Sequence, residues 1–471
     1  MTTEFNSLND IGWYGSAYLL TLMALQPLYG QIYTFFDTKN TFLASLIFFE
    51  IGSTVCATAP SSIVFIVGRA LSGSGAAGIL SGALTLGGRL VPLVKRPLYM
   101  SVIMSMYGVA AVAGPTLGGV FTDSHALTWR FCFYLNLPCG GVAFILCIFL
   151  LKSYAAPHGA GMSILAKLAN IDFVGVVLSI IASVLLFLAL KWGGIDYPWN
   201  SSLVTGCLVG SVVCFAIFVT TQVQQKKRAL ISLNVLTQRT VFFGSLFVCF
   251  INMAIDTHIY YLPLYFQSVD GATASMSGVR ILPYLATMIV TATVSGFCIS
   301  KLGHYVPFMM AGSTLFTIGA GLIHTLAVGS GAAQWVGYQL LAGIGFGMAF
   351  QIPYSALHVV LDAKDLPTGN ALIVFFQALG GALAVSIAQN VLSNELLVRL
   401  ETTILAHDAL AIIAAGPTHI AEAVPGPFVD IVVEAYSYAI SKTFILPIAA
   451  AGMSFLCSLG MEYKKIKKLE K

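Results

Sequence analysis

A small set of charged side chains lies inside apolar stretches of this sequence, and these residues have the greatest capacity for chemistry. They are Glu50, Arg69, Asp123 and Asp256. A charge in hydrocarbon costs a few kcal/mol or more, so such a residue tends to face a cavity or a partner. Asp123 lies near the end of its stretch, where interfacial water explains it. The other three are therefore the candidates for moving or holding charge within a membrane.

Glu50 lies midway along FLASLIFFEIGSTVCATAP and is far from either end of that stretch. Loss of water favours the protonated form of a carboxyl group, so Glu50 could exchange a proton near neutral pH. A static ion pair with Arg69 on the next stretch is the alternative. Asp256 is the second candidate, and His258, two residues further on, falls on another face of the helix. Nearby Tyr260, Tyr261 and Phe266 could line a binding cavity or form an interfacial belt.

Other kinds of chemistry find little support in the residue pattern. The chain has no Gly-Lys dipeptide, which excludes a Walker A loop within it, and no Cys-x-x-Cys or His-Glu-x-x-His motif. Its nine cysteines lie within or beside apolar runs, where they act as small hydrophobes better than as metal ligands or disulfides. We therefore expect no cofactor, no metal and no enzymatic activity.

Helices that cross a membrane must position these charges. Of the 471 residues, 58% are hydrophobic and only 9% are charged, far from the composition of a soluble protein. Each crossing needs about 20 mostly apolar residues in a helix, because lipid cannot satisfy backbone hydrogen bonds. The sequence predicts an all-α membrane protein with thirteen such runs, at about 11–36, 41–59, 62–88, 98–122, 130–151, 172–192, 202–222, 240–267, 276–300, 306–328, 333–354, 368–394 and 440–461.

Basic residues indicate which way the chain is threaded. Alternate loops and the C-terminal tail hold 17 of the 23 lysines and arginines, and such loops stay on the cytoplasmic side. We therefore expect a cytoplasmic C-terminus and an outward Met1, in the plasma membrane or alternatively the vacuolar membrane. The net charge of +4 reflects this topology, so no nucleic acid is expected as a partner. Asn200, in Asn200-Ser201-Ser202, lies outside and is a candidate for N-glycosylation.

Polar linkers divide the chain into three parts. Residues 1–151 hold five runs, residues 152–239 hold a linker and an inserted helix pair, and residues 240–471 hold six runs and a basic tail. Within the last part we expect a large outer loop over residues 395–441. Its segment Ile404–Ala415 is too short and too polar to be another crossing.

Several motifs resemble those of drug:proton antiporters in the fourteen-span branch of the major facilitator superfamily. Gly68–Gly78 resembles the arginine-bearing motif of their fourth span. Ala110–Gly119, which reads AAVAGPTLGG, resembles the antiporter motif GxxxGPxxGG, with Ala110 in place of the first glycine. Three further segments look like fungal toxin and secondary-metabolite exporters: YYLPLYFQSV at Tyr260–Val269, SGVRILP at Ser277–Pro283 and GNALIVFFQALGGALAVSIAQNV at Gly369–Val391.

The antiporter motif also has a direct physical interpretation. Gly114, Gly118 and Gly119 leave one helix face without side chains, which permits close approach of a neighbouring helix. Pro115 removes a backbone donor and can bend the helix. Simple packing would explain the glycines alone. Together with the proline, they favour a pivot between transport states.

The resemblance implies a function and a set of partners. It implies a monomeric efflux transporter that exchanges protons for a toxin, a secondary metabolite or a drug-like organic molecule across the lipid bilayer. An importer of the same fold, for a siderophore or nutrient, shares the composition and differs chiefly at Ala110–Gly119. A membrane sensor that transports nothing is a further alternative, because fold does not determine function.

The N-terminal part departs from the family pattern. Ile11–Phe36 resembles the second span of the family, so the first span is absent from these 471 residues. Gly30 matches the first glycine of the following loop motif, whereas Thr34 replaces its aspartate. We expect weaker charge gating at this loop. We also expect this form to be inactive in transport unless a longer product, with one more helix upstream, is the true protein.

Overall fold

The chain folds into helices throughout the part that the computed structural model describes, namely residues 5, 11–123, 128–153, 159–194, 197–225, 228–402 and 428–465. Eleven helical stretches within it are long and apolar enough to cross a membrane. Helices also form at the two remaining predicted runs, as α2 (Ile11–Phe35) and α5 (Arg96–Asp123). The all-α class and the set of about thirteen spans predicted from the sequence are therefore confirmed.

The remaining helices follow the predicted runs, with short helices between them. They are α3 (Thr38–Thr58), α4 (Ser62–Leu90), η2 (Leu93–Lys95), α6 (Phe131–Tyr134), α7 (Asn136–Leu150), α8 (Ile164–Ala169), α9 (Phe173–Trp192), α10 (Ser202–Gln225), α11 (Leu233–Leu236), α12 (Arg239–Ser268), α13 (Ala274–Arg280), α14 (Leu282–Leu302), α15 (Val306–His324), α16 (Ala332–Ala349), α17 (Ile352–Val360), α18 (Leu366–Glu401), α21 (Val429–Thr443) and α22 (Ile445–Leu459).

Local sequence explains where these helices begin and break. Asp37 caps α3 by accepting a hydrogen bond from the backbone N–H of Asn40 at 3.0 Å, and Ser61 caps α4 in the same way. Four spans are each split into two helices, and each second helix has a proline within its first three residues. Proline supplies no N–H and clashes with the preceding turn, so the helical ladder breaks just before it. These prolines are Pro138, Pro283, Pro353 and Pro447.

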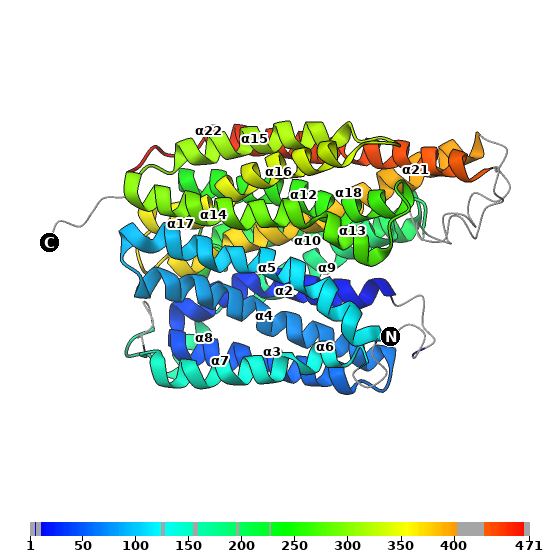
Figure 1. Ribbon diagram of the computed structural model, residues 1–471. Coiled ribbons are helices and arrows are strands. Elements are labelled where there is room, and N and C mark those ends of the chain that lie inside the picture. Colours follow the sequence, from blue (N-terminus) through cyan, green and yellow to red (C-terminus); the bar gives the residue numbers. More distant parts are fainter. Residues whose placement is uncertain are drawn as a thin grey trace.

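The spans form two groups that lie side by side (Figure 1). We name α2 to α7 the N-half, within which α2, α3, α4 and α7 pack together, and α12 to α22 the C-half. The halves meet along two seams, one between α2 and α18 and the other between α5 and α14. At the first seam Gly30 lies against Ala371 and the carbonyl of Pro367.

The packed core lies mainly in the C-half. Its largest fully buried side chains include Phe247, Tyr284, Phe316 and Phe346. Large apolar side chains are instead exposed on outward helix faces, as at Phe149, which is 81% exposed. An exposed apolar surface of this kind fits hydrocarbon rather than water.

The inserted helix pair, α9 and α10, packs along the first seam. The two helices pack against each other, and α9 also contacts α2 and α18. The pair therefore touches both halves.

Helices occupy both ends of the segment predicted as a large outer loop, residues 395–441. Helix α18 continues to Glu401, and α21 already begins at Val429. A helix of 36 residues is about 54 Å long, well beyond the roughly 30 Å of hydrocarbon, so its last turns can continue outside the membrane. Apolar composition does not indicate a helix that continues outside the membrane. Ile404–Ala415 lies outside the described residues.

Candidate functional site

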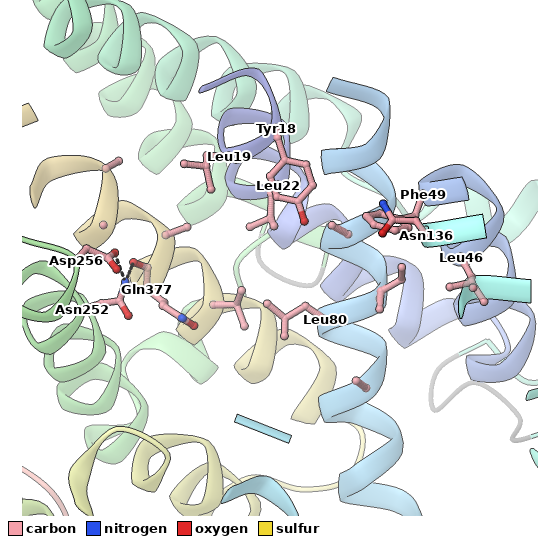
Figure 2. A pocket seen from close by; sticks show the side chains of 18 of the residues that line it. Tyr18, Leu19, Leu22, Leu46, Phe49, Leu80, Asn136, Asn252, Asp256 and Gln377 are labelled. Carbon is pink, nitrogen blue, oxygen red and sulfur yellow. Dashed lines mark hydrogen bonds between the residues drawn. The ribbon is translucent and has the colours of Figure 1, made fainter. Parts of the chain in front are cut away.

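A cavity of about 720 Å³ lies between the two halves (Figure 2). Helices α2, α3, α4 and α7 of the N-half, α12 and α18 of the C-half, and α9 of the inserted pair all contribute to its wall. Most of its lining side chains are apolar, including Leu22, Phe49 and Leu80. Glu50 and Asp256 are the charged residues among those that line it. The structure thus brings together two of the three charged candidates found in the sequence.

Glu50 belongs to the N-half wall of the cavity. Its carboxyl group lies over Gly140 of α7, so closely that a Cβ at that position would overlap Oε1. The other carboxyl oxygen, Oε2, is buried and has no hydrogen-bond partner among the described residues. An ionised carboxylate in this position carries an uncompensated charge, which is costly in an apolar environment.

Asp256 belongs to the C-half wall. Asn252, one turn earlier on α12, donates a hydrogen bond from Nδ2 to Oδ2 of Asp256 at 2.8 Å. The same amide group lies 3.3 Å from the backbone carbonyl of Gln377 on α18, as the dashed lines in Figure 2 show. Gly381 of α18 leaves the space that the carboxyl group occupies. Asp256 therefore has a polar setting that Glu50 lacks.

Arg69 does not line the cavity, and the ion pair with Glu50 considered above does not form among the described residues. Its Nε instead donates to the backbone carbonyl of Tyr14 at 2.7 Å. Its guanidinium group lies over the ring of Tyr18, 4.5 Å from the centroid. The packing of α3 on α4 explains why this ion pair does not form. Gly52 packs on Ser72 and Gly68 packs on Cys56, so Arg69 lies level with Val55. Val55 is about 7 Å from Glu50 along the axis of α3.

Of the aromatic residues near Asp256, one lines the cavity and the others are buried in the core of the C-half. Tyr260 lines the cavity. Tyr261 is buried and donates to Oε1 of Gln389 at 3.1 Å, and Phe266 is fully buried in the C-half. His258 lies on a different face from Asp256, as the helix period predicts, with Nδ1 3.0 Å from the hydroxyl of Tyr284.

Several cavity residues were not selected from the sequence. Asn136 lines the N-half wall and donates from Nδ2 to the hydroxyl of Ser53 at 3.1 Å. Asn252 and Gln377 line the opposite wall, and Phe187 comes from the inserted pair. The same rule that selected Glu50, a polar group amid apolar neighbours, would have found the three amides. Nothing in the sequence distinguishes Phe187.

The antiporter motif lies on α5. A Cβ at Gly114 or Gly118 would meet no described atom within 4 Å in this conformation. The seam between α5 and α14 is tight at other glycines: Gly108 lies against Met288, and Gly296 against Ser101. These two glycines therefore lie where α5 and α14 touch. Pro115 and Gly119 lie within α5, and the transport role of the motif stays a prediction.

Charges near the membrane boundary have local structural roles. Arg130 donates from Nη1 to the backbone carbonyls of Ala57 and Ala59, both at 2.9 Å, at the end of α3. Such bonds satisfy carbonyls that a helix terminus leaves open. Arg280 forms an ion pair with Asp270 at 2.6 Å.

The site suits binding and charge movement rather than bond chemistry. Its volume falls in the range of pockets that enclose drug-sized molecules. No group of histidine, cysteine and carboxylate residues within the described chain is arranged to hold a metal ion. A cavity between two helical bundles is where secondary transporters bind their substrates and coupling ions.

Sequence comparison agrees with this class. The profile of the Major Facilitator Superfamily matches residues 1–385, and the chain belongs to that family of multi-pass membrane transporters; it is not an enzyme. The fold is also that of XylE: a solved double-tryptophan mutant is 13% identical, with a TM-score of 0.62 over 98% of this chain and 88% of that one.

Among its relatives are efflux pumps of filamentous fungi. The aspyridones efflux protein of Neocamarosporium betae is 42% identical over 99% of this chain and 83% of its own length. The efflux pump aflT of Aspergillus parasiticus is 40% identical over 99% of this chain and 91% of its own length. The resemblance to secondary-metabolite exporters seen in the motifs is thereby confirmed.

Proposed function

We propose that this protein exports a toxin, secondary metabolite or drug-like organic molecule in exchange for protons. The observation that carries the proposal is the shared cavity, in which each half contributes one carboxylate, Glu50 and Asp256. Relatives named as efflux pumps support the direction of transport. A largely apolar wall suits a bulky amphiphilic molecule better than a sugar or a phosphate.

The two carboxylates have different roles in this proposal: Glu50 binds the proton and Asp256 attracts the substrate. Protonation of Glu50 would remove the uncompensated charge at its unpartnered oxygen. Asp256, held by Asn252, can remain ionised and attract a positively charged part of the substrate. Binding of a proton on one wall and of substrate on the other would then favour different conformations of the same cavity.

The proposed movement follows the three parts of the chain. Residues 1–151 and 240–471 rock as two bodies about the cavity, and residues 152–239 connect them. Arg69 acts indirectly, through Tyr18 on the cavity wall. Gly114, Pro115, Gly118 and Gly119 act in the transition between transport states, in which the motif lets a neighbouring helix approach closely.

The threading of the chain completes the proposal. We propose that the protein is a monomer of the plasma membrane, and the distribution of basic residues supports a cytoplasmic C-terminus. Asn200 is exposed in the loop between α9 and α10 and would carry a glycan on the outer side.

Proton exchange can be tested in liposomes that contain the purified protein and a pH-sensitive dye. Adding a lipophilic cation such as rhodamine 6G should move protons in the direction opposite to the dye, and Glu50→Gln should abolish this movement. Rhodamine transport without proton movement would overturn the antiport.

Deleting the gene in its host should cause retention of the organism's own metabolites. Starvation for an external nutrient would instead indicate import, and altered signalling with unchanged fluxes would indicate a sensor.

A further inference from the structure

The inserted helix pair contributes directly to the central cavity. Phe187 of α9 lines it, together with Leu19 and Leu22 of α2 and Val385 of α18. Every other lining residue belongs to the N-half or the C-half. A helix that only linked the two halves would not need to place a large aromatic side chain in the transport site.

A buried polar cluster fixes the base of this pair to the N-half. Asp172, the N-cap of α9, is 4% exposed and accepts hydrogen bonds from Gln222 at 2.7 Å and Gln225 at 2.9 Å, both of α10. Its backbone N–H donates to Oε1 of Gln31 on α2 at 3.0 Å. Nε2 of Gln31 in turn donates to the carbonyls of Arg228 and Ala229, just beyond α10. Loss of one partner here would leave buried polar groups unsatisfied, so the base is held firmly.

The register between α9 and α2 follows from this base. The start of α9 meets the end of α2, so the two helices run antiparallel, and Leu28 packs against the cluster that contains Val176. Phe187 is 15 residues beyond Asp172, which is about 22 Å along the helix. Counted back along α2 from Gln31, the same rise ends at Ser16, within one turn of the cavity residues Tyr18 and Leu19.

The other end of the pair packs against the C-half. Gly194 has φ +75°, a conformation that favours glycine, and a side chain there would overlap Oδ1 of Asn390 on α18. That oxygen accepts no hydrogen bond from the described residues. The pair therefore has a fixed base on the N-half and a contact surface on the C-half.

We propose that Phe187 is a specificity-determining residue of the transport site, supplied by the inserted helix pair. At the base of the seam, α2 and α18 touch directly through Gly30 and Ala371. At cavity height, α18 presents the small residues Ala378, Gly381 and Ala382. The ring of Phe187 closes the cavity on this side and limits the length of apolar substrate that fits. This inference rests on the proposed transport function for its biological meaning, but its tests do not require transport.

The first test measures binding selectivity. Purified wild type, Phe187→Ala, Phe187→Leu and Phe215→Ala, in lipid nanodiscs, are titrated into rhodamine 110 alkyl esters from methyl to octyl, and Kd is obtained from fluorescence anisotropy. Phe187→Ala should favour the octyl over the methyl ester by about tenfold relative to wild type, because a few methylenes gain apolar contact. The shift in Phe187→Leu should be smaller. Phe215, on α10 and 55% exposed, is the matched control, and its variant should keep the wild-type ratio.

The second test needs no ligand and keeps the side chain large. Phe187→Trp and Phe215→Trp are placed in bilayers with brominated acyl chains, and the fluorescence of each added tryptophan is compared with that of wild type. Bromine should quench the tryptophan at 215 several times more strongly than the one at 187. Equal quenching would place position 187 in lipid and overturn the proposal even if no ester binds.

The outcomes separate this inference from the proposed function. An unchanged ester ratio in both Phe187 variants, or an equal shift in Phe215→Ala, overturns the role of Phe187. Selective binding that depends on Phe187, without any export of the esters from vesicles, leaves the inference standing and counts against the transport function.

Discussion

The two walls of the cavity pack their carboxyl groups in the same way but differ in the hydrogen bonds that they offer them. In each half a carboxyl group lies over a glycine of a neighbouring helix, Glu50 over Gly140 and Asp256 over Gly381. Asn252 donates a hydrogen bond to Asp256, whereas Oε2 of Glu50 has no partner among the described residues. One wall therefore stabilises a charge that the other leaves uncompensated.

This difference teaches that position in the cavity alone does not determine a carboxylate's role. A hydrogen-bonded carboxylate can remain charged through a transport cycle, and an unpartnered one gains most from taking up a proton. We assign proton exchange to Glu50 and substrate attraction to Asp256 on this basis.

Glu50→Gln should have the largest effect. Proton-driven export of rhodamine 6G by proteoliposomes should fall by at least about 100-fold, because an amide neither takes up nor releases the proton. Export driven by a rhodamine gradient alone should persist and lose its dependence on pH. A wild-type pH profile in this variant would exclude Glu50 as the proton carrier.

Asp256→Asn should weaken binding and spare the coupling. Loss of the charge should raise the KM for rhodamine 6G by about 10- to 100-fold, the range expected for a charged contact. The pH dependence of export should stay that of wild type. If instead Asp256→Asn removes the pH dependence and Glu50→Gln does not, the two assignments must be exchanged.

Gly140→Ala should displace Glu50 without unfolding the protein. The new Cβ would overlap Oε1, which is the end of a flexible side chain and can rotate away. We expect export to change by about 2- to 10-fold, the equivalent of one strained side-chain torsion. The free energy of unfolding should change by less than about 1 kcal/mol. Gly141→Ala is the adjacent control, since a Cβ there meets no described atom within 4 Å.

We expect the smallest effect at Glu462, which lies outside the spans. Unlike Glu50, this carboxylate has a charged partner, Lys464. Lys464 donates to Glu462 at 2.8 Å and lowers the pKa of that carboxyl group, against a smaller opposing effect of burial. A lowered pKa adds stability above the pKa of the unfolded chain, and this stability is lost as pH falls through the folded value. Glu462→Gln should cost less than about 1 kcal/mol at pH 7 and nothing near pH 3. A larger loss at low pH would contradict this sign.

Much of the fold could be predicted from the sequence, because hydrocarbon imposes a simple rule. Every crossing needs an apolar helix of about 20 residues, so the runs found by composition became helices in the structure. The rule does not predict secondary structure outside the membrane. That is why the loop predicted at residues 395–441 proved to be helical at both ends, in α18 and α21.

The candidate site was predicted in part. The cost of charge in lipid selected Glu50 and Asp256, and both line the cavity. The same rule selected Arg69, which is satisfied by the carbonyl of Tyr14 and the ring of Tyr18. Burial cost identifies a residue that needs a partner but does not say whether that partner is a substrate, a carbonyl or a ring.

The class of the protein, its helices and the residues that could carry charge follow from the sequence alone, because they depend on local composition and on the energetics of the bilayer. Which residues meet depends on tertiary packing. Glu50 and Asp256 are 206 positions apart in the sequence and face one cavity because the two halves pack against each other. Phe187 enters that cavity because Asp172 and Gln31 fix the register of α9 against α2. Such long-range contacts depend on helix rotation and register, which no local pattern specifies.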